Sequence, residues 1–347
     1  MDEKKTAVAR RIQAKDLRCE KRQPLQDLIP LPAPFVVYVD PTNLCNFRCR
    51  FCPTADHALM RQIKRAPATM GLDLFRKVID DLKALGVRLK LLSLYKDGEP
   101  LVNRDFAEMV RYAKQAGVAE RIWTKTNGAL LNPELSQRIV EAGLDMICVS
   151  VEGVSSEAYQ RISDVKLDYE AFVGNVRALF ERRGQCEVYV KIADSGLSRA
   201  EVDQFYRDFE PYATHIAVEK LMGWSNSGVK DFTLGTKPDT YDGLPFTPKD
   251  VCAYPFYCLA VNAEGSVVVC ANDWSYATVV GDAKTQSIRE IWEGEALHQF
   301  RRMMLEKRRC ENAACADCFY LQIVPDNLDP YREALLARLA KSRRGHE

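Results

Sequence analysis

The sequence predicts an α/β fold, a partial barrel of six β/α units followed by a small C-terminal unit of a β-hairpin and a helix. Three observations lead to this prediction. Apolar segments of strand length alternate with amphipathic helical segments from residue 35 to about 221, which is typical of a parallel sheet with helical crossovers. Six units are too few to close an eight-stranded barrel. A cysteine-rich stretch then follows the last unit.

The predicted strands are short apolar runs that recur through the first two thirds of the chain. They span Phe35–Val39, Arg88–Tyr95, Arg121–Thr126, Asp145–Val151, Glu187–Ala193 and His215–Leu221. Helix signals separate them. Apolar positions between Leu74 and Leu85 recur at helical spacing, and Gly86 follows as a stop signal. Asn132-Pro133 is typical of a cap and first helical position, and Ser198 with Glu201 forms a capping box.

The composition is that of a water-soluble protein without a strong charge. The chain has 49 basic and 48 acidic residues, a net charge of +1, so no overall field attracts it to nucleic acid or to a membrane surface. No apolar run approaches the roughly 20 residues of a membrane span. Twelve cysteines without a signal peptide favour a reducing compartment over secreted disulfides, so we expect a cytoplasmic, metal-binding protein.

Three of those cysteines form a CxxxCxxC array directly after the first predicted strand. They are Cys45, Cys49 and Cys52. A four-iron cluster is normally held by four thiolates, so three leave one iron open to a group other than protein. The loop at the carboxyl end of a barrel strand is also where barrel enzymes keep their chemistry. The alternative is a zinc site with His57 as the fourth ligand.

The array resembles the signature of the radical S-adenosylmethionine (radical SAM) family. In that family the amino and carboxylate groups of S-adenosylmethionine occupy the open iron of a 4Fe-4S cluster, and the fold is a partial barrel. The resemblance covers residues 35 to 221 or so. It implies that Phe51, immediately before Cys52, lies along the adenine.

Asp97-Gly98-Glu99-Pro100 follows the second predicted strand and is similar to the family's GGEP motif. In the family, the backbone and a carboxylate of this motif hold the amino group of the cofactor. The resemblance therefore assigns Gly98, Glu99 and Pro100 to the cofactor, with Glu99 as the ligand of the amino group. Asp97 replaces a glycine, a residue used where the backbone needs positive φ or close approach.

The ends of the later strands supply further cofactor contacts by resemblance. Four residues are implied to contact methionine or ribose: Thr126, Asn127, Ser150 and Glu152. Lys191 on the fifth strand is implied to meet the cofactor carboxylate. The alternative for the four is local turn and cap chemistry, and for the lysine a solvated strand end.

A second group of cysteines lies in the C-terminal third, where residues 252 to 318 hold six of the twelve. The pattern CxxPxxxxxVxxxGxVxxC from Cys252 to Cys270, a helix over Ser287–Lys307 and then Cys315-Ala-Asp-Cys318 resemble the SPASM and twitch domains. The resemblance implies one auxiliary 4Fe-4S cluster on Cys252, Cys270, Cys315 and Cys318. A zinc ribbon is the alternative. Cys258 and Cys310 are left as substitute ligands, pocket thiols or buried side chains.

These signals divide the chain into five parts. They are an N-terminal extension over 1–34, the barrel over 35–222, a linker or lid over 223–250, the auxiliary-cluster domain over 251–325 and a C-terminal helix and tail over 326–347. Residues 1–23 are expected to form a solvated helix. Tyr331–Arg344 is expected to be a basic amphipathic helix that docks on the barrel.

The expected function is that of a radical enzyme. The resemblance implies that a 5′-deoxyadenosyl radical abstracts hydrogen from the substrate, and that a flavodoxin- or ferredoxin-type protein supplies electrons. A single saturated auxiliary cluster favours outward electron transfer, and hence a dehydrogenase that oxidises a secondary alcohol. The one-cluster architecture resembles radical dehydrogenases that act on sugars or aminocyclitols, which implies that substrate class, and Asp273 or Glu219 is the expected base. The alternatives are an epimerase with Cys258 as hydrogen donor, a peptide maturase, and a non-enzymatic iron-sulfur sensor.

Overall fold

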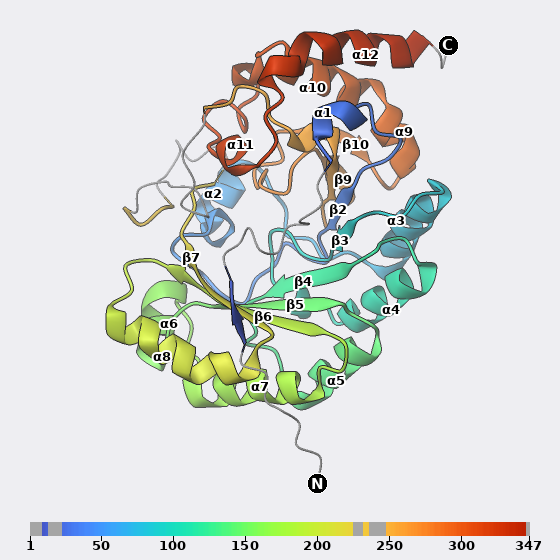
Figure 1. Ribbon diagram of the computed structural model, residues 1–347. Helices are drawn as coiled ribbons and strands as arrows, with labels where there is room; N and C mark the ends of the chain where they lie inside the picture. The colour runs from blue at the N-terminus through green and yellow to red at the C-terminus, as the bar shows by residue number, and fades with distance from the viewer. Residues whose placement is uncertain (1–8, 13–22, 225–231, 236–247, 345–347) are drawn as a thin grey trace.

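One continuous sheet organises the protein (Figure 1). The computed structural model describes residues 9–12, 23–224, 232–235 and 248–344. Within these ranges, ten strands pair in the order β1-β7-β6-β5-β4-β3-β2-β8-β9-β10. The strands are β1 Arg10–Arg11, β2 Val36–Val39, β3 Leu91–Ser93, β4 Ile122–Thr126, β5 Met146–Val151, β6 Glu187–Asp194, β7 His215–Lys220, β8 Cys258–Val261, β9 Ser266–Val268 and β10 Val279–Asp282. Strands β2 to β7 are parallel neighbours in chain order, which confirms the predicted run of β/α units.

Helices alternate with the barrel strands and follow the hairpin. They are α1 Leu25–Leu28, α2 His57–Gln62, α3 Leu72–Ala84, α4 Phe106–Ala116, α5 Pro133–Glu141, α6 Ser156–Ser163, α7 Tyr169–Arg182, α8 Arg199–Phe209, α9 Ile288–Glu293, α10 Glu295–Leu305, α11 Tyr320–Ile323 and α12 Arg332–Arg344. The predicted caps are present. Asn132 Oδ1 accepts from Leu135 N at 2.9 Å, and Ser198 and Glu201 form a capping box.

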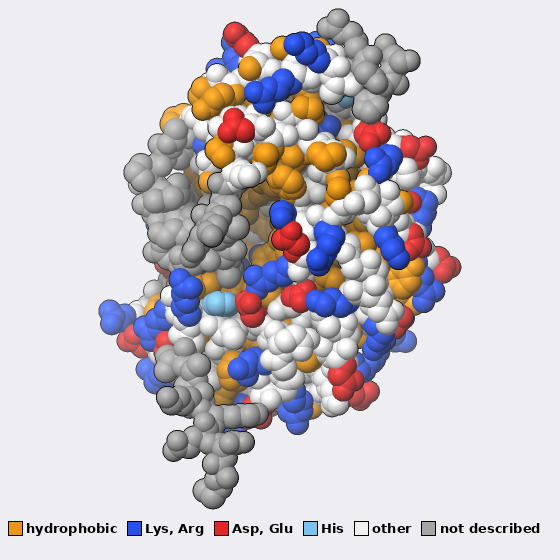
Figure 2. Space-filling model, turned by 45° about the vertical axis from the view of Figure 1, so that its right-hand side comes forward, with side chains coloured by type: hydrophobic (Ala, Val, Ile, Leu, Met, Phe, Trp, Pro, Cys, Tyr) orange, Lys and Arg blue, Asp and Glu red, His pale blue; other side chains and the backbone are white. Residues whose placement is uncertain are grey.

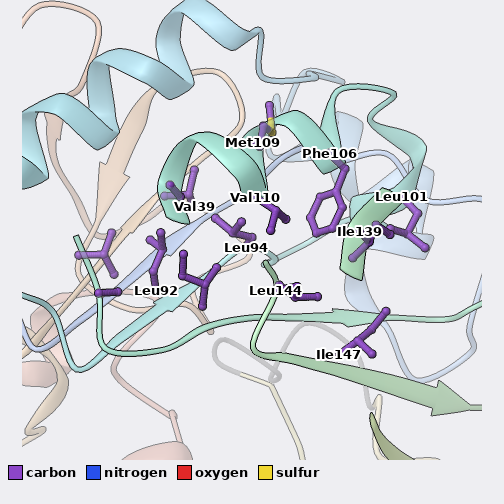
Figure 3. Close-up of a cluster of buried hydrophobic side chains, with 14 of the residues drawn as sticks. Val39, Leu92, Leu94, Leu101, Phe106, Met109, Val110, Ile139, Leu144 and Ile147 are labelled. Atoms are coloured by element: carbon purple, nitrogen blue, oxygen red, sulfur yellow. The ribbon is translucent and has the colours of Figure 1, made fainter. Parts of the chain in front are cut away.

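The barrel core lies between the sheet and the helices that cover its outer face. In Figure 3, Val39 of β2, Leu92 of β3 and Ile147 of β5 belong to one cluster of buried side chains with Phe106 and Val110 of α4. All five side chains are at most 1% exposed, and burial of this kind is the main source of stability for the layer. The core leaves the carboxyl ends of the strands, and the loops that follow them, free for chemistry.

The N-terminal extension differs from the expected solvated helix where it is described. Arg10–Arg11 forms β1, which pairs in parallel with β7 at the edge of the sheet. The exposed edge of β7 offers unpaired backbone groups, and Arg10 N donates to Thr214 O at 3.0 Å. Arg11 also donates two hydrogen bonds to the carboxylate of Glu210. The rest of residues 1–22 lies outside the described residues, apart from 9 and 12.

The C-terminal hairpin extends the barrel sheet. Strand β8 pairs with β2 in parallel and with β9 antiparallel, as the predicted hairpin requires, and Gly265 closes its turn with a φ of 106°. The helix predicted over 287–307 is broken into α9 and α10. Gly294 is extended there, with ψ of 159°, and a side chain at this position would lie 2.5 Å from Glu290 O. The predicted linker over 223–250 lies largely outside the described residues.

Helix α12 differs from the expectation that it docks on the barrel, because it packs on α10 and α1 (Figure 1). Leu335 and Leu339 are 1% and 3% exposed and pack with Met304 and Leu25 in one apolar cluster. Arg338 Nη1 donates to Gln26 O at 2.7 Å. None of the described helices is long and apolar enough to cross a membrane.

The packing of α12 is tested by Leu335→Ala. Removal of this buried side chain should lower the free energy of unfolding by about 2–4 kcal/mol, because the transfer and cavity terms both apply. Glu333→Ala, whose side chain is 83% exposed, is the control and should change little. Thermal denaturation followed by circular dichroism measures both. Equal midpoints for Leu335→Ala and the wild type would show that α12 is not part of the cooperative core.

Candidate active site between two groups of cysteines

A cavity of about 290 Å³ lies at the carboxyl ends of the barrel strands. It is lined by residues from the loops after β2 to β7 and by residues of the C-terminal unit. Those used below are Cys45, Cys49, Phe51, Cys52, Gly98, Glu99, Lys125, Thr126, Asn127, Ser150, Glu152, Lys191, Glu219, Tyr254 and Tyr320. Parallel pairing brings these strand ends to one edge of the sheet. On the face in Figure 2, acidic and basic side chains are interspersed around a hollow with apolar side chains.

Cys45, Cys49 and Cys52 lie together in the loop after β2 and line this cavity. Each is a free thiol. Burial raises the pKa of all three, that of Cys45 to about 12, so the protein alone keeps them protonated and a metal must displace the protons. Phe47 N donates to Cys45 Sγ at 3.4 Å, a backbone contact of the kind that tunes iron-sulfur clusters.

The described residues contain no group of three or more His, Cys, Asp or Glu side chains arranged around a single metal ion. A four-iron cluster makes a different demand, because each thiolate binds its own iron. His57, the alternative zinc ligand, is exposed at the start of α2. It lines an outer groove together with Cys49 and Cys52, whereas Cys45 lines the central cavity.

Gly98 and Glu99 bring the loop after β3 against the cysteine loop. A Cβ at Gly98 would lie 2.2 Å from Thr42 O and 2.4 Å from Leu44 O, so this position requires glycine for close approach. Glu99 N donates to Leu44 O at 2.8 Å. The two loops therefore form one backbone cradle.

The carboxylate of Glu99 is buried and held by three donors. Oε1 accepts from Thr126 Oγ1 at 2.6 Å and from Leu101 N at 3.0 Å, and Oε2 accepts from Asn127 N at 2.7 Å. Burial raises the pKa of Glu99 to about 7, although these hydrogen bonds oppose the shift. A carboxylate oxygen can accept more than one hydrogen bond, so Oε2 can still receive a donor from a ligand.

Asp97, which replaces the first glycine of the motif, does not adopt a positive φ. The loop therefore does not need glycine at this position. Asp97 Oδ2 accepts from Arg65 Nη2 at 2.7 Å and from Lys96 Nζ at 2.6 Å, and the three side chains are at most 4% exposed. Arg65 and Lys96 also donate, at 3.0 Å each, to the carbonyls of Trp274 and Asp273. Asp97 thus ties the barrel loop to the loop after Cys270.

Of the other residues predicted to contact the cofactor, all but Pro100 line the central cavity. The cavity is lined by Phe51, Thr126, Asn127, Ser150, Glu152 and Lys191. Pro100 is buried at the start of a short 3-10 helix and does not line it. Burial raises the pKa of Glu152 to about 7, although the charges of Lys191 and Lys125 oppose the shift.

Lys191 and Glu219 form an ion pair on the cavity wall. Lys191 Nζ lies 2.6 Å from Glu219 Oε2, and Tyr189 OH donates to Oε1 at 2.6 Å. Burial alone would raise the pKa of Glu219, but the charges of Lys191 and Lys125 outweigh burial and lower the pKa to about 2. Glu219 is therefore a weak base, and Lys191 is already occupied by a carboxylate.

Lys125 is a cavity residue that the sequence analysis did not identify. It lies on β4 between Trp123 and the strand-end pair Thr126-Asn127, with its Nζ 5.2 Å from the centre of the Tyr95 ring. Burial, and then the like charge of Lys191, lower its pKa. Among the described residues it has no carboxylate partner. The available sequence signal was a lysine at the carboxyl end of a predicted strand, directly before Thr126-Asn127.

The second group of cysteines lines a small cavity of about 30 Å³ in the C-terminal unit. Cys252, Cys270, Cys315 and Cys318 are all free thiols on its wall. Burial raises the pKa of each of them. Asn272 N donates to Cys270 Sγ at 3.4 Å. Four thiols of this kind fit a cluster whose irons are all held by protein.

Asp273, the first candidate base, does not reach the central cavity. Its two carboxylate oxygens accept four hydrogen bonds from within the next five residues, two from Thr278 and one each from Ser275 and Ala277. Asp273 therefore holds a turn beside the small cavity. Cys258 is fully buried in β8 and Cys310 is exposed, and neither lines either cavity.

Tyr254 and Tyr320 stand between the two cavities. Both residues line the central cavity and the small cavity, and their ring centres are 6.1 Å apart. These two aromatic side chains therefore form a wall that the two spaces share. No sequence signal marked these tyrosines, because each belongs to an otherwise ordinary apolar segment.

Two family models match the chain. Residues 39–207 match the model of the Radical SAM superfamily, and residues 252–319 match the SPASM model, described as an iron-sulfur cluster-binding domain.

Curated proteins match over part of their length. The AdoMet-dependent heme synthase of Methanosarcina barkeri is 28% identical over 148 residues, 42% of this chain and 39% of that protein. The mycofactocin maturase MftC of Mycobacterium ulcerans is 25% identical over 193 residues, 55% of this chain and 48% of that protein. The chain therefore spans less than half the length of these relatives.

Solved structures share the fold. The structure of SuiB of Streptococcus suis bound to S-adenosylmethionine aligns with a TM-score of 0.61 at 13% sequence identity. The alignment covers 87% of this chain and 75% of the SuiB chain. The structure of BtrN in complex with AdoMet and 2-DOIA aligns with a TM-score of 0.53 at 17% sequence identity. The alignment covers 82% of this chain and 92% of the BtrN chain.

The backbone cradle is tested by Gly98→Ala. The added Cβ meets two backbone carbonyls and cannot be accommodated without moving the loop, so we expect binding of S-adenosylmethionine to weaken by at least about tenfold. Gly174→Ala is the matched control, because no atom lies within 4 Å of its Cβ and alanine in the middle of α7 should stabilise the helix by about 0.5–1 kcal/mol. Anaerobic calorimetry measures binding. Wild-type affinity in a folded Gly98→Ala protein would contradict the cradle.

Proposed function

Because this chain belongs to the radical SAM superfamily and carries a SPASM iron-sulfur domain, we propose that it is a dehydrogenase that oxidises a secondary alcohol of a sugar or aminocyclitol. The family implies S-adenosylmethionine, a 4Fe-4S cluster and auxiliary iron-sulfur chemistry. Two cysteine groups on either side of one aromatic wall fit this set of cofactors.

We assign the first cluster to Cys45, Cys49 and Cys52, which leave one iron for S-adenosylmethionine. Glu99 would hold the cofactor's amino group, since it lines the cavity and its Oε2 has a single protein donor, Asn127 N. We assign a single auxiliary cluster to Cys252, Cys270, Cys315 and Cys318. When bound, these groups supply a 5′-deoxyadenosyl radical that abstracts hydrogen and, at the second site, a one-electron acceptor.

The observation that carries the dehydrogenase proposal is the shared wall of Tyr254 and Tyr320. Oxidation of a secondary alcohol to a ketone removes one hydrogen atom from carbon, one proton from oxygen and one electron. A substrate in the central cavity would be separated from the four auxiliary thiols by this wall. This arrangement supports an electron that leaves the substrate, as a dehydrogenase requires.

Lys125 is our candidate for the base that takes the hydroxyl proton. A general base should have a pKa near the working pH, and burial lowers the pKa of this lysine toward that range. Asp273 faces a turn and Glu219 has its pKa lowered by two lysines, so both earlier candidates suit the role less well. In this proposal Lys191 remains the ion-pair partner of Glu219 in the cavity wall.

The two competing enzyme functions are an epimerase and a peptide maturase, and different observations bear on each. The epimerase alternative loses its expected hydrogen donor, because Cys258 is buried away from the cavity. A peptide maturase is the second candidate, since relatives include a mycofactocin maturase and a PqqA peptide cyclase. A flavodoxin- or ferredoxin-type protein would supply the electrons in either case.

The role of Glu99 predicts a pH dependence of cofactor binding. Glu99 has a pKa of about 7 in the free protein and must be ionised to accept hydrogen bonds from the amino group. Lowering the pH from 8 to 6 should therefore weaken binding of S-adenosylmethionine by about tenfold. The Glu99→Gln variant should bind S-adenosylmethionine weakly at both pH 8 and pH 6. Its affinity should therefore lack the part of the pH dependence that Glu99 causes. Identical pH profiles for the two proteins would show that Glu99 is not the ligand.

The function is tested by an anaerobic assay with dithionite and S-adenosylmethionine. We expect 5′-deoxyadenosine and, with a panel of aminocyclitols and sugars, a product two hydrogens lighter than the substrate. Lys125→Met should still form 5′-deoxyadenosine but lose most of the ketone, while Lys90→Met on the surface should behave as the wild type. A product of unchanged mass would favour an epimerase, and activity on peptides alone a maturase. No 5′-deoxyadenosine at all would refute enzymatic function.

A further inference from the structure

An outer groove of about 370 Å³ adjoins the cysteine loop that also lines the central cavity. It is lined by Arg48, Cys49, Arg50, Cys52 and His57, among others. Cys49 and Cys52 line both the groove and the central cavity. One loop therefore separates the proposed cluster site from the protein surface.

The groove is basic at the point where it reaches the cysteines. Arg48 and Arg50 stand on either side of Cys49, and both are exposed. Their backbone N–H groups donate to Ser163 O and Ile162 O at 2.9 Å each, which fixes the loop against the end of α6. Neither guanidinium has an acidic partner among the residues that the structure describes. Asp56 also lines the groove, and its Oδ1 accepts from Leu59 N as the cap of α2.

Neither arginine of this basic rim lines the central cavity, where the proposed cofactor and substrate sites lie. A protein donor cannot enter a cavity of about 290 Å³, so it must approach the cluster from outside. Exposed, unpaired positive charges accelerate encounter with a negatively charged partner. The groove has both the position and the sign of charge that such a donor needs.

We propose that Arg48 and Arg50 form the docking surface for a small acidic one-electron carrier protein. The carrier loses one electron, and the cluster held by Cys45, Cys49 and Cys52 is reduced by one electron. The inference rests on that proposed cluster site. It assigns to the outer groove a role that is separate from the chemistry of the central cavity.

The test is the reduction rate of the reconstituted protein by a prereduced acidic flavodoxin. Stopped-flow absorbance follows the cluster in the wild type, in Arg48→Glu/Arg50→Glu and in Arg138→Glu/Arg182→Glu. The control pair has the same change in net charge, but it lies at the carboxyl ends of α5 and α7, beside the amino ends of the strands. We expect the first variant to be reduced at least roughly tenfold more slowly at low ionic strength, with the difference shrinking at high salt.

Photoreduced 5-deazaflavin, a small neutral donor, separates docking from the cluster itself. All three proteins should be reduced by it at similar rates and should then cleave S-adenosylmethionine. Equal rates of reduction by flavodoxin in all three would overturn the proposal, and so would slow reduction of the Arg48/Arg50 variant by both donors. Failure of the wild type to form 5′-deoxyadenosine with 5-deazaflavin would instead refute the proposed function.

Discussion

The pairing of β8 with β2 is the constraint on which the site depends. Strand β2 is hydrogen-bonded along both edges, to β3 and to β8. The C-terminal unit therefore continues the barrel sheet. All four residues of β8 are fully buried, as expected for a parallel strand covered on both faces. Because the loop after β2 carries the first cysteine group and the segment before β8 carries Cys252, this pairing fixes the two groups relative to one another.

The charge cluster around Asp97 reinforces the same connection. A buried carboxylate is stable only when paired, and here its partners Arg65 and Lys96 each reach a carbonyl of the loop after Cys270. Both cations also lie over the ring of Tyr276, at 4.5 and 4.8 Å. Loss of one partner from a buried pair typically costs about 3–5 kcal/mol. The geometry of the Gly98-Glu99 loop and that of the auxiliary loop are therefore linked through one side chain.

The sequence was sufficient where the signal is local. The periods of apolar residues predict the six barrel strands, and the resemblance to the SPASM and twitch domains implies the four cysteines that line the small cavity. It was insufficient where distant segments meet. The pairing of Arg10–Arg11 with β7 and of β8 with β2 depends on which sheet edges are open. The lowered pKa of Lys125 depends on its burial and on the like charge of Lys191 from β6. The carboxylate of Asp273 faces a turn for a local reason, because Ser275 and Thr278 follow it at turn spacing and donate to it.

The central claim is that the two cysteine groups hold two separate clusters on opposite sides of the tyrosine wall. Metal analysis with Mössbauer spectroscopy of anaerobically reconstituted protein tests it most directly. The account predicts about eight irons per chain as two four-iron clusters, and about four in the variant with Cys45, Cys49 and Cys52 changed to alanine. Zinc in place of iron, or a wild type with a single cluster, would contradict it.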